Sequence, residues 1–497
     1  DSSNGIYDVS YAADALGSEE ATQAFVFDNA GSATNGPVGV DVYTGGDDAI
    51  TTANMSVTGD NFVAFYTGAA GNDTIETLNI AAANGEDSIA FAADTELTVM
   101  TDLTLTGDLT VDFSDVNDGS SGGTDSLTTV TVTDDAGATL DLGATFALAA
   151  DGFTYTGGAG DDVLAADVSS GDFAGADGTI DGGEGQDTLN LTGDDSTSGD
   201  VSNVAVTDFE IVNITDGDSQ AGSGSSALTD ASLYEGVEQL WQIDGAADVT
   251  NLGAGTAAGF RAIDGVDVNV TATETATSAT LALDELAGGS GGEVTALGES
   301  IGVLEVVGRI DVAGAALDTV NVAGNLTPTT EDALGLISVG VSAGSETETL
   351  TVNSDVAVEI FLNDADRADD ATAVTTLNAA GAVAGAMIGA DLSEGSLTPT
   401  DDDENKTLSS VITGDAGDLV FMTTAQAEDA EDDVNVTVNT AGGDDLIGLD
   451  TDVEGSVSVN AGDGDDLISL AAASDNAQLA LGNSFDGGEG DDTFVIN

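Results

Sequence analysis

The chain has 497 residues, of which 92 are Asp or Glu and only four are Lys or Arg, so its formal net charge is −88. This charge excludes nucleic acid as a partner, because phosphate binding needs Lys and Arg, and it disfavours an anionic membrane. The absence of Cys excludes disulfides and thiolate metal sites, whereas a patterned hydrophobic content of 41% argues against disorder.

Short β-type runs separated by Gly, Asp and Asn turns occur along the whole chain. Leu97–Leu105, Thr129–Thr133 and Val434–Asn439 have the period-two, β-branched pattern of strands with one buried face. Helical spacing predicts only one short helix, within 226–241. Because aromatic residues make up only 4% of the chain, we expect a core of Val, Ile, Leu and Ala. The fold class is therefore all-β, with stacked β-solenoid or β-roll and β-sandwich-like layers.

A degenerate rung also recurs, in which an acidic residue or Thr is followed by apolar, Asn and apolar positions. Its copies are irregularly spaced at Ile75–Ile80, Asp187–Leu191, Phe209–Ile214, Leu317–Val322 and Val374–Asn378. Asn side chains can form ladders between the coils of a solenoid, so we predict an inward-facing Asn at each turn. The alternative is that Asn simply tolerates the turn conformation.

The density of Gly-Asp turns divides the chain into three parts. Residues 1–200 form a predicted N-terminal β domain with these turns, 201–409 a central rung-repeat domain, and 410–497 a C-terminal β domain with turns. Thr398–Asn405 is expected to be a boundary loop. No apolar run approaches the roughly 20 residues needed to span a bilayer, so no transmembrane segment is expected. The start at Asp1 rather than Met is consistent with removal of an N-terminal secretion segment.

Three Gly-Asp turns match the pattern G-G-x-G-x-D-x-apolar in full. They begin at Gly157, Gly182 and Gly487 and place the Asp of the pattern at Asp162, Asp187 and Asp492. Looser copies keep the last Gly, the Asp and the apolar residue, with the acidic residue at Asp48, Asp73, Asp87, Asp445 and Asp466.

These turns carry the groups that Ca²⁺ requires. The ion takes six to eight hard oxygen ligands, and Gly allows the positive φ that turns backbone carbonyls toward it. Plain Gly-Asp hairpin turns would account for a single loose copy but poorly for three full matches. We therefore predict several bound Ca²⁺ ions and folding linked to calcium. The predicted metal-site residues are Gly157, Gly158, Gly160, Asp162, Gly182, Gly183, Gly185, Asp187, Asp445, Gly464, Asp466, Gly487, Gly488, Gly490, Asp492, Asp48, Asp73 and Asp87.

The turns resemble the RTX calcium-binding repeat. In that family each ion lies between two stacked turns of a β-roll and joins two coils. Tandem repeats would follow every nine residues, but Asp162 and Asp187 lie 25 residues apart and Asp445 and Asp466 lie 21 apart. We expect each turn to close one coil of a wider sheet, or to pair with a looser turn.

The RTX-like turns, Thr- and Val-rich strands, Asn rungs and near absence of Lys together resemble the acidic surface-layer proteins of marine gammaproteobacteria. A more distant likeness is to the RTX-type surface-layer proteins of stalked alphaproteobacteria. The resemblance implies a secreted structural protein that assembles with copies of itself, through calcium, into a two-dimensional lattice on a Gram-negative cell surface. It also implies attachment to surface polysaccharide or lipopolysaccharide.

Two other classes of function are the alternatives to a surface-layer protein. An enzyme is not expected, because without His and Cys there is no Ser-His-Asp triad or thiol nucleophile, and four dispersed cations cannot line the sugar groove of a lyase. A calcium-dependent adhesin or biofilm-matrix protein shares the calcium chemistry and the β architecture. It stays the alternative, although the long near-identical tandem domains usual in adhesins are absent.

Overall fold

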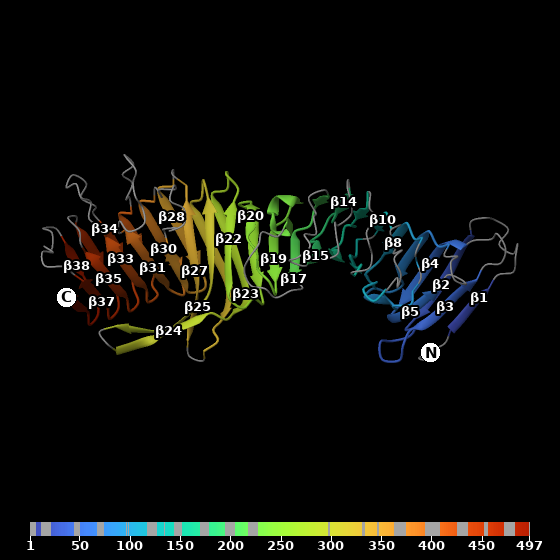
Figure 1. The fold of residues 1–497 in the computed structure, drawn as a ribbon, viewed down its shortest axis with the longest axis horizontal. Helices are drawn as coiled ribbons and strands as arrows, with labels where there is room; N and C mark the ends of the chain where they lie inside the picture. The colour runs from blue at the N-terminus through green and yellow to red at the C-terminus, as the bar shows by residue number, and fades with distance from the viewer. Residues whose placement is uncertain are drawn as a thin grey trace. The chain divides into compact units, whose positions relative to one another are not determined.

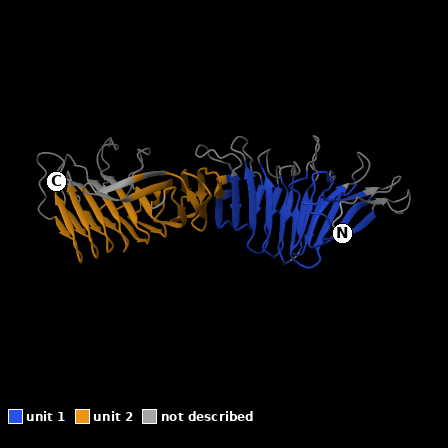
Figure 2. Ribbon diagram, turned by 90° about the horizontal axis from the view of Figure 1, so that it is seen from below, with its two compact units in different colours: residues 1–218, 226–228, 232–241 blue, residues 219–225, 229–231, 242–497 orange. Residues whose placement is uncertain are grey.

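The computed structural model describes most of the chain outside the longer loops between coils. The described residues are 6–10, 21–43, 50–66, 74–95, 97, 99–116, 127–133, 135–143, 152–168, 178–193, 204–216, 227–296, 299–330, 333–344, 347–361, 374–392, 408–424, 436–451, 456–471 and 483–496. The chain divides into two compact units (Figure 2). Unit 1 comprises residues 1–218, 226–228 and 232–241, and unit 2 comprises 219–225, 229–231 and 242–497.

Unit 1 is a parallel β-solenoid in which successive coils add one strand to each of two sheets (Figure 1). One sheet contains β1 (Ile6–Ser10), β3 (Val38–Tyr43), β5 (Asp60–Tyr66), β7 (Asp87–Phe91), β9 (Leu109–Asp112), β11 (Ala138–Asp141), β13 (Val163–Asp167), β15 (Thr188–Gly193) and β17 (Ile211–Asp216). The other contains β2 (Ala21–Asp28), β4 (Ile50–Thr58), β6 (Thr77–Ala82), β8 (Asp102–Thr106), β10 (Thr129–Val132), β12 (Thr154–Thr156), β14 (Gly178–Asp181), β16 (Val204–Thr207) and β18 (Tyr234–Glu235).

Unit 2 repeats this plan; β19 (Gln239–Ile243) lies at the boundary in the chain. Its first sheet contains β21 (Ala257–Arg261), β23 (Ser278–Ala287), β26 (Thr319–Thr327), β28 (Thr349–Ser354), β30 (Thr376–Ala382), β32 (Ser410–Ile412), β34 (Val436–Asn439), β36 (Val457–Asn460) and β38 (Ser484–Asp486). Its second contains β20 (Val249–Leu252), β22 (Val266–Ala272), β25 (Glu299–Gly314), β27 (Leu334–Ala343), β29 (Val358–Phe361), β31 (Ala386–Leu392), β33 (Leu419–Thr424), β35 (Leu446–Thr451), β37 (Leu467–Ala471) and β39 (Thr493–Ile496). Among the strands of the described residues, β24 (Ser290–Ala296) departs from the parallel pattern and pairs antiparallel with β25.

The core of each coil forms because strand alternation sends every second side chain inward. In unit 1, Leu103, Val130, Tyr155 and Ile180 occupy equivalent positions of successive strands and are all buried. Burying such a side chain contributes roughly 1.5–3 kcal/mol, so like side chains stacked coil upon coil hold the solenoid together. The expectation of an aliphatic core was incomplete, because the largest fully buried side chains are aromatic and include Phe91 and Phe113, stacked with ring centroids 4.6 Å apart.

The fold confirms the all-β, solenoid-like expectation, and it corrects three details. The Asn ladders exist, as in the 2.8 Å hydrogen bond from Asn213 Nδ2 to Asn190 Oδ1. However, these Asn lie within strands and are half-buried rather than inward-facing at turns. The expected helix is two single 3₁₀ turns, Ala227–Thr229 and Ala231–Leu233. The run predicted from Leu97 becomes a strand only at Asp102.

The long spacing between Gly-Asp turns is the length of one coil. Val163 pairs with Thr188 and Leu446 pairs with Leu467 in adjacent parallel strands, so each turn is followed by the next one directly above it. The expectation that each turn closes one coil of a wider sheet is therefore confirmed. The predicted boundary loop Thr398–Asn405 lies outside the described residues, and the division into three domains stays a prediction.

Candidate calcium-binding columns of buried aspartates

The acidic residues of the Gly-Asp turns lie in columns, one above another, at the beginning of successive parallel strands. In unit 1 the column consists of Asp162, Asp187 and Glu210, just before β13, β15 and β17. In unit 2 it consists of Asp418, Asp445, Asp466 and Asp492, just before β33, β35, β37 and β39. We call these the first and second carboxylate columns.

Each carboxylate in the first column accepts a backbone hydrogen bond from the preceding coil. The N–H of Ala138 donates to Asp162 Oδ1 at 2.6 Å, and the N–H of Asp162 donates to Asp187 Oδ1 at 2.6 Å. The N–H of Asp187 in turn donates to Glu210 Oε2 at 2.7 Å. The side chains therefore connect consecutive coils at a point where the strand ladder has ended.

The second column repeats this arrangement over four coils. The N–H groups of Ala386, Asp418, Asp445 and Asp466 donate to Oδ1 of the next acidic residue, over 2.7, 2.7, 2.9 and 3.2 Å. Asp418 is fully buried, and Asp445 and Asp466 are each 2% exposed. Burying an ionised carboxylate without a neighbouring cation is energetically unfavourable. Whether the column binds an ion therefore depends on the second oxygen of each carboxylate.

The second oxygens of four of these carboxylates make no hydrogen bond within the described part of the chain. They are Oδ2 of Asp187, Asp418, Asp445 and Asp466, and all four atoms are buried. Such atoms are satisfied by a proton, a cation or an ordered water molecule.

The pKa values of the column carboxylates follow from this burial. Burial, helped by the neighbouring charges of Asp418 and Asp466, raises the pKa of Asp445 to about 7, although the Thr440 hydroxyl and the Asp418 N–H lower it. Burial likewise raises the pKa of Asp187 and of Asp418 to about 6. The columns therefore hold acids that bind a positive charge, as H⁺ or as a metal ion, more readily than an exposed Asp does.

A second row of acids runs beside the columns on the outer side of the same turns. The N–H of Asp465 donates to Asp444 Oδ1 at 2.9 Å, and the N–H of Asp491 donates to Asp465 Oδ1 at 2.8 Å. In unit 1 the N–H of Gln186 donates to Asp161 Oδ1 at 2.9 Å. Adjacent coils are about 4.8 Å apart, where two like charges repel by about 1 kcal/mol even in bulk water. The repulsion within this outer row is weakened by solvent and salt, because Asp161, Asp444 and Asp465 are exposed.

The glycines of the turns are required by the stacking itself. Gly464 has φ +148°, and a Cβ on it would lie 1.9 Å from the carbonyl oxygen of Gly443 in the preceding coil. Gly185 has φ +142°, with the Gly160 carbonyl oxygen 2.6 Å from the same hypothetical atom. Only Gly permits this φ together with this approach of two backbones. The turn glycines thus have a packing role that does not depend on a metal ion.

The structure brings most of the sequence-predicted residues together at these turns. In unit 1, the turn before β13 contains Gly157, Gly158, Gly160 and Asp162, and the turn before β15 contains Gly182, Gly183, Gly185 and Asp187. In unit 2, the turn before β35 contains Asp445, the turn before β37 contains Gly464 and Asp466, and the turn before β39 contains Gly487, Gly488, Gly490 and Asp492. Asp48 and Asp73 lie outside the described residues. Whether any of these residues binds calcium stays a prediction.

Asp87 lies on the same sheet edge as the first column but differs from it in its contacts. Its Oδ1 accepts the Gly59 N–H at 2.7 Å, and its Oδ2 accepts the N–H groups of Ala83 and Asn84, each at 2.9 Å. These hydrogen bonds, led by that from Asn84, lower the pKa of Asp87. Both of its oxygens have partners, so the structure assigns this Asp a role in closing the turn.

Two members of the columns were missed at the level of sequence. Asp418 follows Gly417 directly, whereas the pattern requires one residue between Gly and Asp, as in Gly443-Asp-Asp445. Glu210 has no preceding Gly and reaches the same position with a longer side chain. The signal that would have found Asp418 is the acid two residues before a buried apolar residue, Val420.

The residues of the columns fit Ca²⁺ in their donor chemistry. They offer hard carboxylate oxygens without a partner in turns that contain glycine, and Ca²⁺ accepts both carboxylate and backbone carbonyl oxygens. The described part of the chain contains no group of three or more acidic side chains arranged to hold one ion. An ion at Asp187, Asp445 or Asp466 would therefore need backbone carbonyls or water for most of its ligands.

Comparison with known proteins leaves the fold and the site as the basis for assigning a function. No protein-family model, no curated protein and no solved structure matches this chain. Among its described residues there is also no helix with the length and hydropathy to cross a membrane.

Proposed function

We propose that this chain is a calcium-stabilised structural protein of a bacterial cell surface, which assembles with copies of itself into a two-dimensional layer. The observation that carries the proposal is the pair of carboxylate columns, with buried and unpartnered oxygens at Asp187, Asp418, Asp445 and Asp466. Bound Ca²⁺ would neutralise these oxygens and join consecutive coils. It would also reduce the self-repulsion of a chain with net charge −88.

The architecture supports a structural role. Stacked coils contact only their neighbours, so a long solenoid gains stability step by step and presents extended flat faces to partners. Side chains from the acidic rows lie at the edges of these faces, where divalent ions can also bridge separate copies. Extracellular calcium would then control both folding and assembly. The proposed location is the outer surface of a Gram-negative cell, and the proposed role is not enzymatic.

The experiment that tests the proposal compares purified protein with and without calcium by negative-stain electron microscopy. Ordered sheets are expected in millimolar Ca²⁺, dispersed particles in chelator, and no sheets when Mg²⁺ replaces Ca²⁺. Magnesium is a matched control, because it carries the same charge but demands a smaller octahedral site and gives up its water reluctantly. Dispersed monomers in calcium would contradict the layer and favour the adhesin or biofilm-matrix alternative.

A further inference from the structure

The turn between β6 and β7 has an Asn-Gly pair at its exposed tip. The turn consists of Ala83, Asn84, Gly85 and Glu86, all exposed, and it carries the chain from one sheet of unit 1 to the other. Gly85 has φ +81° and Glu86 has φ +56°, so two successive residues lie in the left-handed region. An exposed Asn followed by a residue without a side chain allows the next backbone nitrogen to attack the side-chain amide.

The two groups that would react are both unrestrained. Within the described part of the chain, neither the Gly85 N–H nor the side-chain amide of Asn84 takes part in a hydrogen bond. A Cβ built on Gly85 would find Asp108 Oδ2 as its nearest atom beyond the chain neighbours, at 4.0 Å. The backbone at this position therefore has room to adopt the geometry of attack.

A second Asn-Gly pair in unit 1 is restrained at the corresponding nitrogen. Asn35 is also exposed, but the Gly36 N–H donates to the Ser32 carbonyl oxygen at 2.7 Å, and the Ser32 N–H donates to the Gly36 carbonyl oxygen at 3.2 Å. A further pair, at Asn4, lies outside the described residues. The two described pairs therefore combine the same sequence chemistry with different backbone restraint.

Coil stacking restrains the nitrogen of other turn glycines that follow an acid. The N–H groups of Gly182, Gly265 and Gly464 donate to the carbonyl oxygens of Thr207, Ala287 and Glu489 in the adjacent coil, at 3.0, 3.0 and 2.8 Å. Attack by such a nitrogen would first have to break a bond between coils. Gly85 makes no bond of this kind, so stacking does not protect the residue before it.

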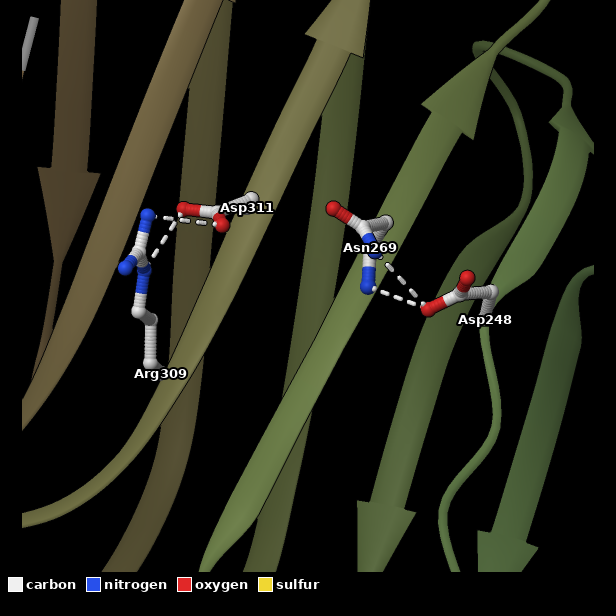
Figure 3. A network of polar contacts seen from close by, with 4 residues as sticks. All are labelled: Asp248, Asn269, Arg309 and Asp311. Carbon is white, nitrogen blue, oxygen red and sulfur yellow. Dashed lines mark hydrogen bonds and ion pairs between the residues drawn. The ribbon is translucent and has the colours of Figure 1, made fainter. Parts of the chain in front are cut away.

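Asn269 in unit 2 shows how the fold holds an exposed Asn in place (Figure 3). Its N–H and its Nδ2 donate to Asp248 Oδ1 at 2.8 and 3.1 Å. The next residue is Val270, which is fully buried and pairs with Val312 in the adjacent strand. Both the side-chain amide and the following nitrogen are therefore fixed, which makes Asn269 an internal reference for an unreactive Asn.

We propose that Asn84 is a site of spontaneous deamidation and isomerisation in the folded protein. The Gly85 nitrogen attacks Cγ of Asn84, the N–Cγ bond forms and the Cγ–Nδ2 bond breaks, and ammonia leaves with the proton that the Gly85 nitrogen gives up. Water then opens the resulting succinimide. Its attack at Cγ gives Asp, whereas its attack at the main-chain carbon gives isoaspartate, and in both cases a proton returns to the Gly85 nitrogen. Water is the co-reactant, and nothing is oxidised or reduced.

The isoaspartate product alters a turn that Asp87 closes. Asp87 Oδ2 accepts the N–H groups of Ala83 and Asn84, each at 2.9 Å. Isoaspartate adds one methylene to the backbone between Asn84 Cα and the Gly85 nitrogen, and it leaves a new carboxylate beside Glu86 and Asp87. Both changes weaken the turn, so the modified coil is less stable. The inference depends neither on calcium binding nor on layer formation.

The test is peptide mapping by mass spectrometry of the full-length protein, incubated at mildly alkaline pH and sampled over time. Because the chain has only four Lys and Arg, the peptides come from an Asp- or Glu-specific protease. Asn84 should react about tenfold faster than Asn35, since releasing Gly36 from its two hydrogen bonds lowers the reactive population by about that factor. Asn269 should stay unmodified. In urea, where neither pair is restrained, Asn84 and Asn35 should react at similar rates.

Asn84→Gln is the matched variant, because the longer side chain keeps the amide but forms the cyclic imide far more slowly. After the same incubation, calorimetry should show the melting temperature of unit 1 lowered by several degrees in the wild type and unchanged in the variant. Far-UV circular dichroism checks that the variant folds. The inference is overturned if Asn84 stays unmodified, or if Asn35 reacts as fast in the folded protein. It is also overturned if the preference for Asn84 persists in urea, which would assign it to the sequence rather than to the fold.

Discussion

Replacing Asp445 with Asn should change stability in opposite directions with and without calcium. The Asn carbonyl oxygen can still accept the Asp418 N–H that Asp445 accepts at 2.7 Å, but the charge is gone. With its pKa raised to about 7, ionised Asp445 costs up to about 4 kcal/mol at pH 8, at 1.4 kcal/mol per pKa unit. An unpartnered amide donor costs about 1–3 kcal/mol. We therefore expect the variant to gain about 2 kcal/mol in chelator.

Calcium should reverse the sign of the change in stability that this substitution causes. An ion present at 100 times its Kd stabilises the wild type by about 2.7 kcal/mol, a contribution that the variant loses with its ligand oxygen. The variant should then be about 1 kcal/mol less stable than the wild type in calcium. The measurement is urea unfolding at pH 8, followed by far-UV circular dichroism, in chelator and in calcium. If the chelated wild type is already expanded, the variant should instead show a larger folded fraction.

The matched control for this prediction is Asp444→Asn. Asp444 is exposed in the same turn and accepts the Asp465 N–H at 2.9 Å, so the variant loses the same charge without touching the buried column. It should differ little from the wild type in either condition. The reasoning is refuted if Asp445→Asn has the same sign of effect in chelator and in calcium, or if it cannot be told apart from Asp444→Asn.

Three further predictions concern the columns, the core and the turns. In chelator, the free energy of unfolding should fall as the pH rises from about 4 to 7. The reason is that the folded carboxylates with pKa values of about 6 and 7 keep protons that the unfolded chain has released. Urea unfolding at several pH values should show this fall, and saturating calcium should remove it. Phe113→Ala, at a fully buried ring, should cost about 3–5 kcal/mol, and calorimetry should assign the loss to the transition of unit 1. Gly462→Ala should lower the melting temperature by several degrees, because the new Cβ would lie 1.9 Å from the Ala441 carbonyl oxygen at φ +104°; Gly255→Ala, where open space surrounds the position, should not.

Sequence reasoning could reach the solenoid because its signals are local. Strand alternation at Thr129–Val132 and the Gly-Asp turns before β13, β15 and β39 can each be read within ten residues, and together they give all-β coils closed by turns. The separation of 25 residues between Asp162 and Asp187 indicated that each turn closes one coil. The direction of the Asn side chains was wrong, because a rung pattern fixes which residues alternate but not which of the two faces meets the core.

Other features depend on the register between successive coils and cannot be recognised within a short stretch of sequence. Asp418 joins its column only because Leu419 pairs with Leu446 one coil later. The packing of the Phe361 ring against Gly389 is still less visible, because the two residues are a full coil apart and become neighbours only when β29 and β31 pair. Contacts between equivalent positions of successive coils therefore need the structure.

The most direct test of the calcium columns is a high-resolution map of the protein prepared in ample calcium. The account predicts ion density at about 2.3–2.6 Å from Oδ2 of Asp187, Asp445 and Asp466, with backbone carbonyls of the turns completing each site. A well-ordered map with no ion at these oxygens, from protein that is equally folded in chelator, would contradict it.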